Sequence, residues 1–167
     1  MEIKRLGPIG AEIKDLDLTN LNEQESNQIK NSFLEYSVLV FRNQMLNPEQ
    51  LKSISTLWGE PLVHPVFKGI DGHPEIIEIK NFGEKYHTNA HWHSDVTFED
   101  SPPDATLLYS IVVPDEGGDT LFSSQHLAYN DLDSKLKSDL ANKVAVHSNI
   151  GVLMLSGPVS YTHLRAH

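Results

Sequence analysis

One histidine and one aspartate form the clearest chemical feature of this sequence. His93 and Asp95 stand one residue apart in the segment 92–98, whose β-branched and aromatic residues predict a strand. Alternate residues of a strand point to the same side, so we expect both side chains to face one point. Imidazole and carboxylate are two of the ligands in the two-histidine, one-carboxylate iron site, which leaves three coordination positions open. Trp92 alternates to the other face, where we expect it in the core.

A series of turn and strand signals follows the pair. Pro102-Pro103 is followed by the run Pro114-Asp115-Glu116-Gly117-Gly118-Asp119-Thr120. The two glycines of this run would let the backbone come close to a site, and Thr120 would begin the next strand. Without the His-x-Asp pair, an ordinary hairpin would explain the same residues.

Taken together and in this order, these residues resemble the signature of the taurine dioxygenase family, whose members use Fe(II) and 2-oxoglutarate. The spacing between His93 and Thr120 is also similar to that of the family. Further similarity lies in the segments Ile9–Glu12, Val38–Arg42, Pro48–Gln50, His64–Pro65, Ala128–Tyr129 and Ala145–His147. The resemblance therefore extends from near residue 1 to about residue 150.

The resemblance implies a set of cofactors and a reaction. His93 and Asp95 would bind Fe(II), and the hydroxyl of Thr120 would hydrogen-bond a carboxylate of 2-oxoglutarate. With O2 as the oxidant, a family enzyme hydroxylates a small organic acid such as taurine or another sulfonate and releases succinate and CO2. In such reactions the cofactor carries the difficult chemistry, while the protein positions the substrate and excludes water.

Three further residues are implied to bind an anionic small-molecule substrate. His64 matches a histidine that contacts the sulfonate in the family, and Asn89 matches a residue that contacts the amine. Phe67 stands where taurine dioxygenase has a tyrosine, and it offers no hydroxyl. An alkyl sulfate or an aryloxy acid is therefore an alternative substrate, and a non-catalytic, cupin-like binding protein is the alternative from another class.

The elements that must position these residues change in character along the chain. An N-cap pattern at Asn22 and a proline after Asn47 predict two helices early in the sequence. Two further helices are predicted over His126–Leu132 and Ser134–Ala141. Strands are predicted over Ile3–Leu6, Ala11–Asp15, Val38–Phe41, Ile76–Ile79, Trp92–Phe98, Thr106–Val113, Thr120–Phe122 and Lys143–His147. This order indicates an α+β domain, and the resemblance implies a double-stranded β-helix (a cupin-like jelly roll) with flanking helices.

Composition excludes several classes of function. The 167 residues contain 13 basic and 23 acidic side chains, for a formal charge of −10, which argues against nucleic acid as a partner. The absence of cysteine excludes disulfides, thiolate zinc sites and cysteine nucleophiles. No signal peptide or membrane span is predicted, so a cytoplasmic protein without a membrane partner is expected.

The last residues do not fit the family. Its second ligand histidine and its 2-oxoglutarate-binding arginine are expected much further along the chain than Thr120. His163 and Arg165 imitate these two residues, but the segment Val159–His167 resembles a translated sequencing adapter. We therefore expect residues 1–157 to form a partial dioxygenase domain, incomplete at its C-terminus, and residues 158–167 to be a non-native tail. The 167-residue chain is expected to be inactive and its full-length parent to be a homo-oligomeric enzyme.

Overall fold

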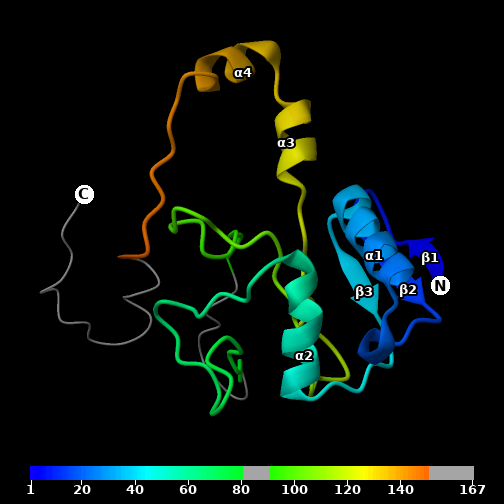
Figure 1. Cartoon of the computed structure of the whole chain (residues 1–167). Helices are drawn as coiled ribbons and strands as arrows, with labels where there is room; N and C mark the ends of the chain where they lie inside the picture. The colour runs from blue at the N-terminus through cyan, green and yellow to red at the C-terminus, as the bar shows by residue number, and fades with distance from the viewer. Residues whose placement is uncertain (81–90, 151–167) are drawn as a thin grey trace, which may run out of the picture. The chain divides into compact units, whose positions relative to one another are not determined.

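The computed structural model describes residues 1–80 and 91–150 (Figure 1). The chain divides into two compact units. The first unit comprises Met1–Trp58 and Leu108–Ala145. The second comprises Gly59–Leu107 and Val146–His167. The predicted iron ligands His93 and Asp95 therefore belong to the second unit, whereas Thr120 belongs to the first.

A three-stranded sheet forms the base of the first unit. Strand β1 (Glu2–Arg5) pairs antiparallel with β2 (Ala11–Lys14), and β2 pairs parallel with β3 (Leu39–Phe41). The alternation of side chains in β2 places Ala11 and Ile13 in the core, with only 0% and 2% of their surface exposed. All three predicted strands of this region are confirmed, and β2 is the central one.

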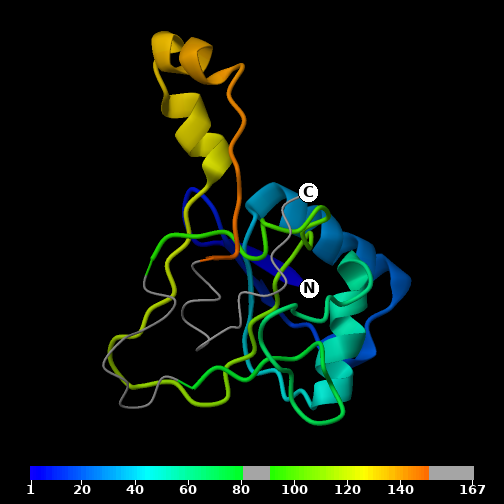
Figure 2. The ribbon, with the colours of Figure 1, turned by 90° about the vertical axis from the view of Figure 1, so that its left-hand side faces the viewer.

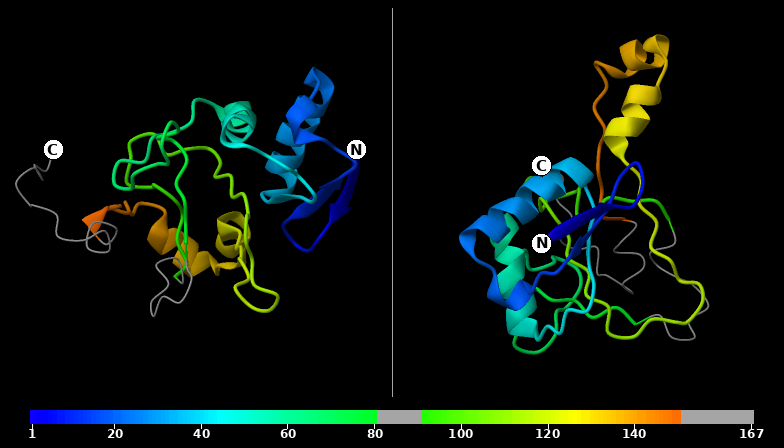
Figure 3. Two further views of the ribbon diagram at one scale, coloured as in Figure 1. Left: turned by 90° about the horizontal axis from the view of Figure 1, so that it is seen from below. Right: turned by 90° about the vertical axis from the view of Figure 1, so that its right-hand side faces the viewer.

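Helix α1 (Glu23–Tyr36) covers this sheet (Figure 3). Its first turn is closed by a capping box: the Asn22 side chain accepts from the Glu25 amide at 2.9 Å, and the Glu25 carboxylate accepts from the Asn22 amide at 3.0 Å. The helix ends where Ser37 adopts a left-handed conformation, with φ of 64°. Ile29 is fully buried on the inner face of the helix.

A second capped helix, α2 (Pro48–Ser55), completes this core. Asn47 and Gln50 repeat the capping box, and proline occupies the first turn, where it costs no hydrogen bond. The helix continues into the short 3-10 helix η2 (Thr56–Trp58). There the Trp58 ring meets Phe33 of α1 edge to face, with 5.5 Å between ring centroids. Another 3-10 helix, η1 (Leu18–Asn20), buries Leu18.

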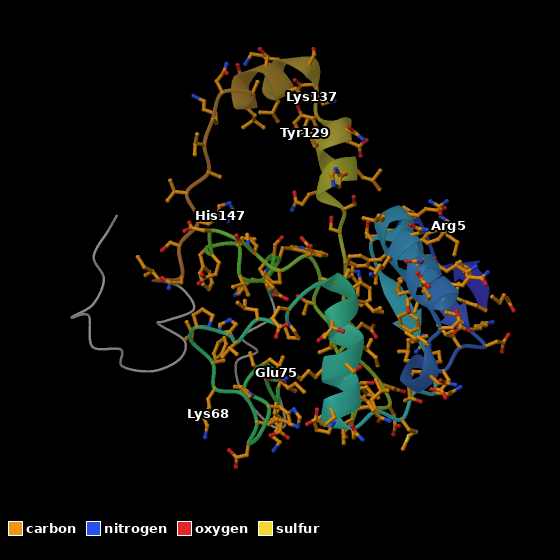
Figure 4. All side chains as sticks on the ribbon, viewed as in Figure 1. Arg5, Lys68, Glu75, Tyr129, Lys137 and His147 are labelled. Carbon is orange, nitrogen blue, oxygen red and sulfur yellow. The ribbon has the colours of Figure 1, made fainter. Side chains whose placement is uncertain are left out.

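Two short helices, α3 (Gln125–Asp131) and α4 (Ser134–Leu140), follow each other directly in the first unit (Figure 2). Ser124 and Asp133 cap their first turns by accepting from Leu127 and Leu136 amides. Lys137 lies against the Tyr129 ring, 5.6 Å from its centroid (Figure 4). Both predicted helices are thereby confirmed.

The strands predicted after α2 are wrong for the described residues. The segments 76–79, 92–98, 106–113, 120–122 and 143–147 contain no ladder pairing, and the three-stranded sheet is confined to β1–β3. A strand exists only when its amide and carbonyl groups find a neighbouring strand. The helices and the small sheet agree with the α+β prediction, whereas the jelly roll stays a prediction.

The described residues of the second unit, 59–80, 91–107 and 146–150, form turns and irregular segments. Its most regular part is the turn from Ile70 to Ile76, where the Ile70 amide donates to the Ile76 carbonyl at 2.8 Å. Gly69 packs so closely against the backbone of Pro74 that a Cβ would not fit. Along residues 1–80 and 91–150, no helix has both the length and the apolar character needed to cross a membrane.

Candidate metal centre

His93 and Asp95 lie together, as the sequence predicts. His93 Nε2 is 3.1 Å from Asp95 Oδ1, and about half of each side chain is exposed, at 50% and 45%. The pair is thus formed within the protein and also open to a ligand from solvent.

The backbone that brings the pair together is a turn and not the predicted strand. Val96 has a φ of 52°, and the Glu99 amide donates to the Val96 carbonyl at 3.1 Å. A positive φ at a β-branched residue breaks an extended strand, so strand alternation does not position the pair. Trp92 is 71% exposed, and its prediction as a core residue is wrong.

The hydrogen bond of His93 Nδ1 determines whether Nε2 of the same neutral ring carries a hydrogen or a lone pair. Nδ1 lies 2.7 Å from the carbonyl oxygen of His91. A carbonyl only accepts hydrogen bonds, so Nδ1 carries the hydrogen and Nε2 of the neutral ring presents a lone pair. This lone pair faces an oxygen of Asp95 that also only accepts. Two such atoms at this distance need a cation between them, either a proton on Nε2 or a metal ion.

The spacing of the two atoms suits a metal ion. Two ligands at right angles, each about 2.1 Å from one ion, lie about 3.0 Å apart. The 3.1 Å between His93 Nε2 and Asp95 Oδ1 is close to this value. A backbone carbonyl on the second nitrogen is also the usual support of a metal-binding histidine. Among residues 1–80 and 91–150, however, no group of three metal-binding side chains gathers at one place.

The second oxygen of Asp95 has a partner that sequence reasoning missed. Thr106 Oγ1 donates to Asp95 Oδ2 at 2.9 Å. Thr106 was assigned only to a strand, and nothing in its neighbourhood marks it, since a threonine eleven residues from a carboxylate is an ordinary occurrence. Its role depends on how the chain folds back between the two positions.

His64 is held in one orientation within the second unit. Its Nδ1 accepts from the amides of Val66 and Phe67, both at 3.0 Å, so in the neutral ring Nε2 carries the hydrogen. The Phe67 ring packs on the imidazole, with 4.8 Å between centroids. Burial lowers the pKa of His64, and the negative charges of Asp95 and Glu99 act in the opposite direction. His64 is therefore a neutral hydrogen-bond donor next to an apolar ring.

The remaining predicted site residues are placed less directly. Thr120 is exposed and lies in the first unit, whereas His93 and Asp95 lie in the second. That Thr120 belongs to the same site therefore stays a prediction. Asn89 lies outside the described residues. His147, labelled in Figure 4, lies with its Nδ1 2.8 Å from Thr97 Oγ1, beside the turn that follows Asp95.

Comparison with known proteins identifies relatives of this chain. The model of the family described as taurine catabolism dioxygenase TauD, TfdA family matches residues 2–152. An alkylsulfatase of Acinetobacter baylyi is 36% identical over 89% of this chain and 47% of its own length. A sulfate ester dioxygenase of Pseudomonas putida, dependent on alpha-ketoglutarate (2-oxoglutarate), is 35% identical over 86% of this chain and 48% of its own length. More distant relatives are named sulfonate and 2,4-dichlorophenoxyacetate dioxygenases.

A solved structure of a protein named a taurine dioxygenase is also similar to this chain. The crystal structure of a taurine dioxygenase from Burkholderia xenovorans superposes with a TM-score of 0.74 and 38% identity, over 84% of this chain and 51% of its own. The chain thus spans about half the length of the relatives that it matches. Because the family model covers nearly all of the chain, this protein belongs to the TauD/TfdA family of taurine catabolism dioxygenases.

Proposed function

We propose that this chain is the amino-terminal part of an Fe(II)- and 2-oxoglutarate-dependent dioxygenase that oxidises a small organic anion and releases succinate and CO2. The observation that carries the proposal is the 3.1 Å contact between His93 Nε2 and Asp95 Oδ1. In a neutral His93 ring both atoms are hydrogen-bond acceptors, and a metal ion between them would satisfy both. Membership of a dioxygenase family makes Fe(II) the cation of choice.

The proposed roles of the residues are distinct. His93 and Asp95 would hold the iron, and the Thr120 hydroxyl would bind a carboxylate of 2-oxoglutarate. Bound iron supplies the activation of O2 that no side chain provides. This chain matches about half the length of its relatives. We propose that the third iron ligand, and the arginine that binds the second carboxylate of 2-oxoglutarate, belong to the region that corresponds to the other half. The complete fold would then be a double-stranded β-helix.

A sulfate ester is the substrate that the His64 region favours over taurine. His64 presents an Nε2 hydrogen, which suits an oxygen of a sulfate or sulfonate group. Phe67 places an apolar ring beside this donor, where an amine would find no hydrogen-bond acceptor. Two relatives of this chain are named for sulfate esters. We therefore propose an alkyl sulfate, whose carbon chain would lie along the Phe67 ring.

Metal binding by the 167-residue chain tests the site directly. Titration with Mn(II), with free Mn(II) measured by electron paramagnetic resonance, should detect binding that His93→Ala and Asp95→Ala each abolish. The control is His126→Ala, which removes an exposed histidine of α3 and should leave binding unchanged. Binding that survives both site substitutions would refute the assignment of the metal to this pair.

The proposed activity is tested on the longer protein that we expect the source gene to encode. The source DNA should be read through codon 157, where we expect the frame to continue to a distal histidine and arginine. That protein, supplied with Fe(II), 2-oxoglutarate and O2, should release sulfate from an alkyl sulfate more efficiently than sulfite from taurine. Metal binding without substrate-dependent succinate release would instead favour a non-catalytic, cupin-like binding protein.

A further inference from the structure

We propose that Thr106 is a positioning residue of the metal site, whose hydroxyl holds one oxygen of Asp95 so that the other faces His93. The inference rests on the proposed function, because it assigns a support to the same ligand pair. Thr106 Oγ1 donates to Asp95 Oδ2 at 2.9 Å, while Asp95 Oδ1 lies 3.1 Å from His93 Nε2. Each carboxylate oxygen therefore has its own partner.

Asp95 needs such a support because little else restrains it. Its side chain is 45% exposed, and the terminal torsion of an aspartate is broad, so the carboxylate would rotate easily without a hydrogen bond to Thr106. A metal ion that binds a rotating carboxylate must also offset the loss of that freedom. The Thr106 hydrogen bond restricts the rotation before the ion arrives, which raises the affinity of the pair.

The same hydrogen bond determines how Asp95 binds. With Oδ2 occupied by the Thr106 hydroxyl, only Oδ1 is directed towards the position that it shares with His93. A carboxylate that uses one oxygen fills one coordination position instead of two. In a site with two histidines and one carboxylate, such one-oxygen binding would leave three positions open. Thr106 would thereby limit Asp95 to one position on a bound ion.

His91 supports the opposite side of the pair. Its carbonyl accepts from His93 Nδ1 at 2.7 Å, in the way that the Thr106 hydroxyl donates to Asp95. Both metal ligands are consequently oriented by a hydrogen bond on the atom that does not face the ion. The His91 support comes from the backbone and survives most substitutions, whereas the Thr106 support depends on a side chain and can be removed.

The chain provides a matched set of variants. Thr106→Val keeps the shape of the side chain without its hydroxyl, and Thr106→Ser keeps the hydroxyl. Thr19→Val is the control, because Thr19 Oγ1 donates to Asp17 Oδ1 at 2.7 Å in the first unit. In the Mn(II) titration of the full chain, Thr106→Val should weaken binding about tenfold. Thr106→Ser and Thr19→Val should bind as the unchanged protein does.

Two results would overturn the inference: unchanged Mn(II) affinity in Thr106→Val, or an equal loss in Thr106→Ser. Failure of the proposed function looks different, since the unchanged protein would then show no binding that depends on His93. In that case carbon-13 NMR of the metal-free chain tests whether Thr106 positions Asp95. The carboxylate signal of Asp95 should shift in Thr106→Val and stay in place in Thr106→Ser, and a signal that stays in place in both variants rejects the positioning role.

Discussion

At the scale of single residues, His64 shows how a histidine is fixed as a neutral donor. Two backbone amides donate to its Nδ1, and the Phe67 ring covers one face of its imidazole. A protonated ring would lose both amide contacts, because its Nδ1 would then carry a hydrogen of its own. Burial acts in the same direction and lowers the pKa of His64. The local structure thus maintains the neutral donor form that we propose binds an anionic substrate.

The titration of His64 follows from these contacts. Its pKa should lie below the ordinary value of 6.5, mainly because burial disfavours the charged ring. Since the unfolded chain then takes up the proton first, His64 reduces stability as the pH falls from 6.5 to its folded pKa, and no further below that. Glu99→Gln removes a negative charge that raises this pKa and should lower it further. NMR titration of the imidazole measures both values, and a rise in Glu99→Gln would contradict this account.

At the scale of elements, the two early helices are specified by their own residues. Asn22 with Glu25, and Asn47 with Gln50, each satisfy two amides that the first turn of a helix leaves unpaired. These contacts are local, so a helix start can be located before any packing is known. The burial of Ile29 then attaches α1 to the sheet.

The cap of α1 should contribute measurably to stability. Asn22→Ala removes the oxygen that accepts from the Glu25 amide, and it should lower the free energy of unfolding by about 1 kcal/mol. Asn27→Ala makes the same change at an exposed position inside α1, where alanine is the better helix former, and it should not destabilise. Urea unfolding followed by circular dichroism measures the free energy of unfolding of both variants. Equal stability of the two variants would show that the capping box contributes nothing.

The separation along the sequence between interacting residues explains which features could be predicted. The capped helices are local, and β1–β3 join segments that lie close along the chain or pack on α1, so both were predicted correctly. The later strands depend on partners that the described residues do not supply. At the site, the proximity of His93 and Asp95 was predicted, although a turn and not the expected strand brings them together. The role of Thr106 was not predicted, because its contact depends on the path of the chain between two positions.

At the scale of the whole molecule, several apolar residues of the predicted strand over 106–113 stay exposed. Ile111 is 81% exposed, with Leu108, Val112 and Val113 between 66% and 70% beside it. Ile111, Val112 and Val113 form a continuous β-branched run without charge, which is typical of segments that associate when they are uncovered. Leu34 of α1 is equally exposed, at 81%, but it is a single apolar residue on a helix surface. Exposure is therefore equal at the two positions, while their surroundings differ.

This difference predicts how the chain behaves in solution. A continuous apolar segment associates with copies of itself, whereas single exposed apolar residues are common on stable proteins. Ile111→Lys should therefore reduce self-association clearly, and Leu34→Lys should change it little. Both variants alter the net charge equally, so charge repulsion between molecules cannot account for a difference. Sedimentation velocity over a range of protein concentrations measures the effect. Equal reduction by both variants would mean that the added polar side chain, and not its position in the segment around Ile111, controls association of this chain.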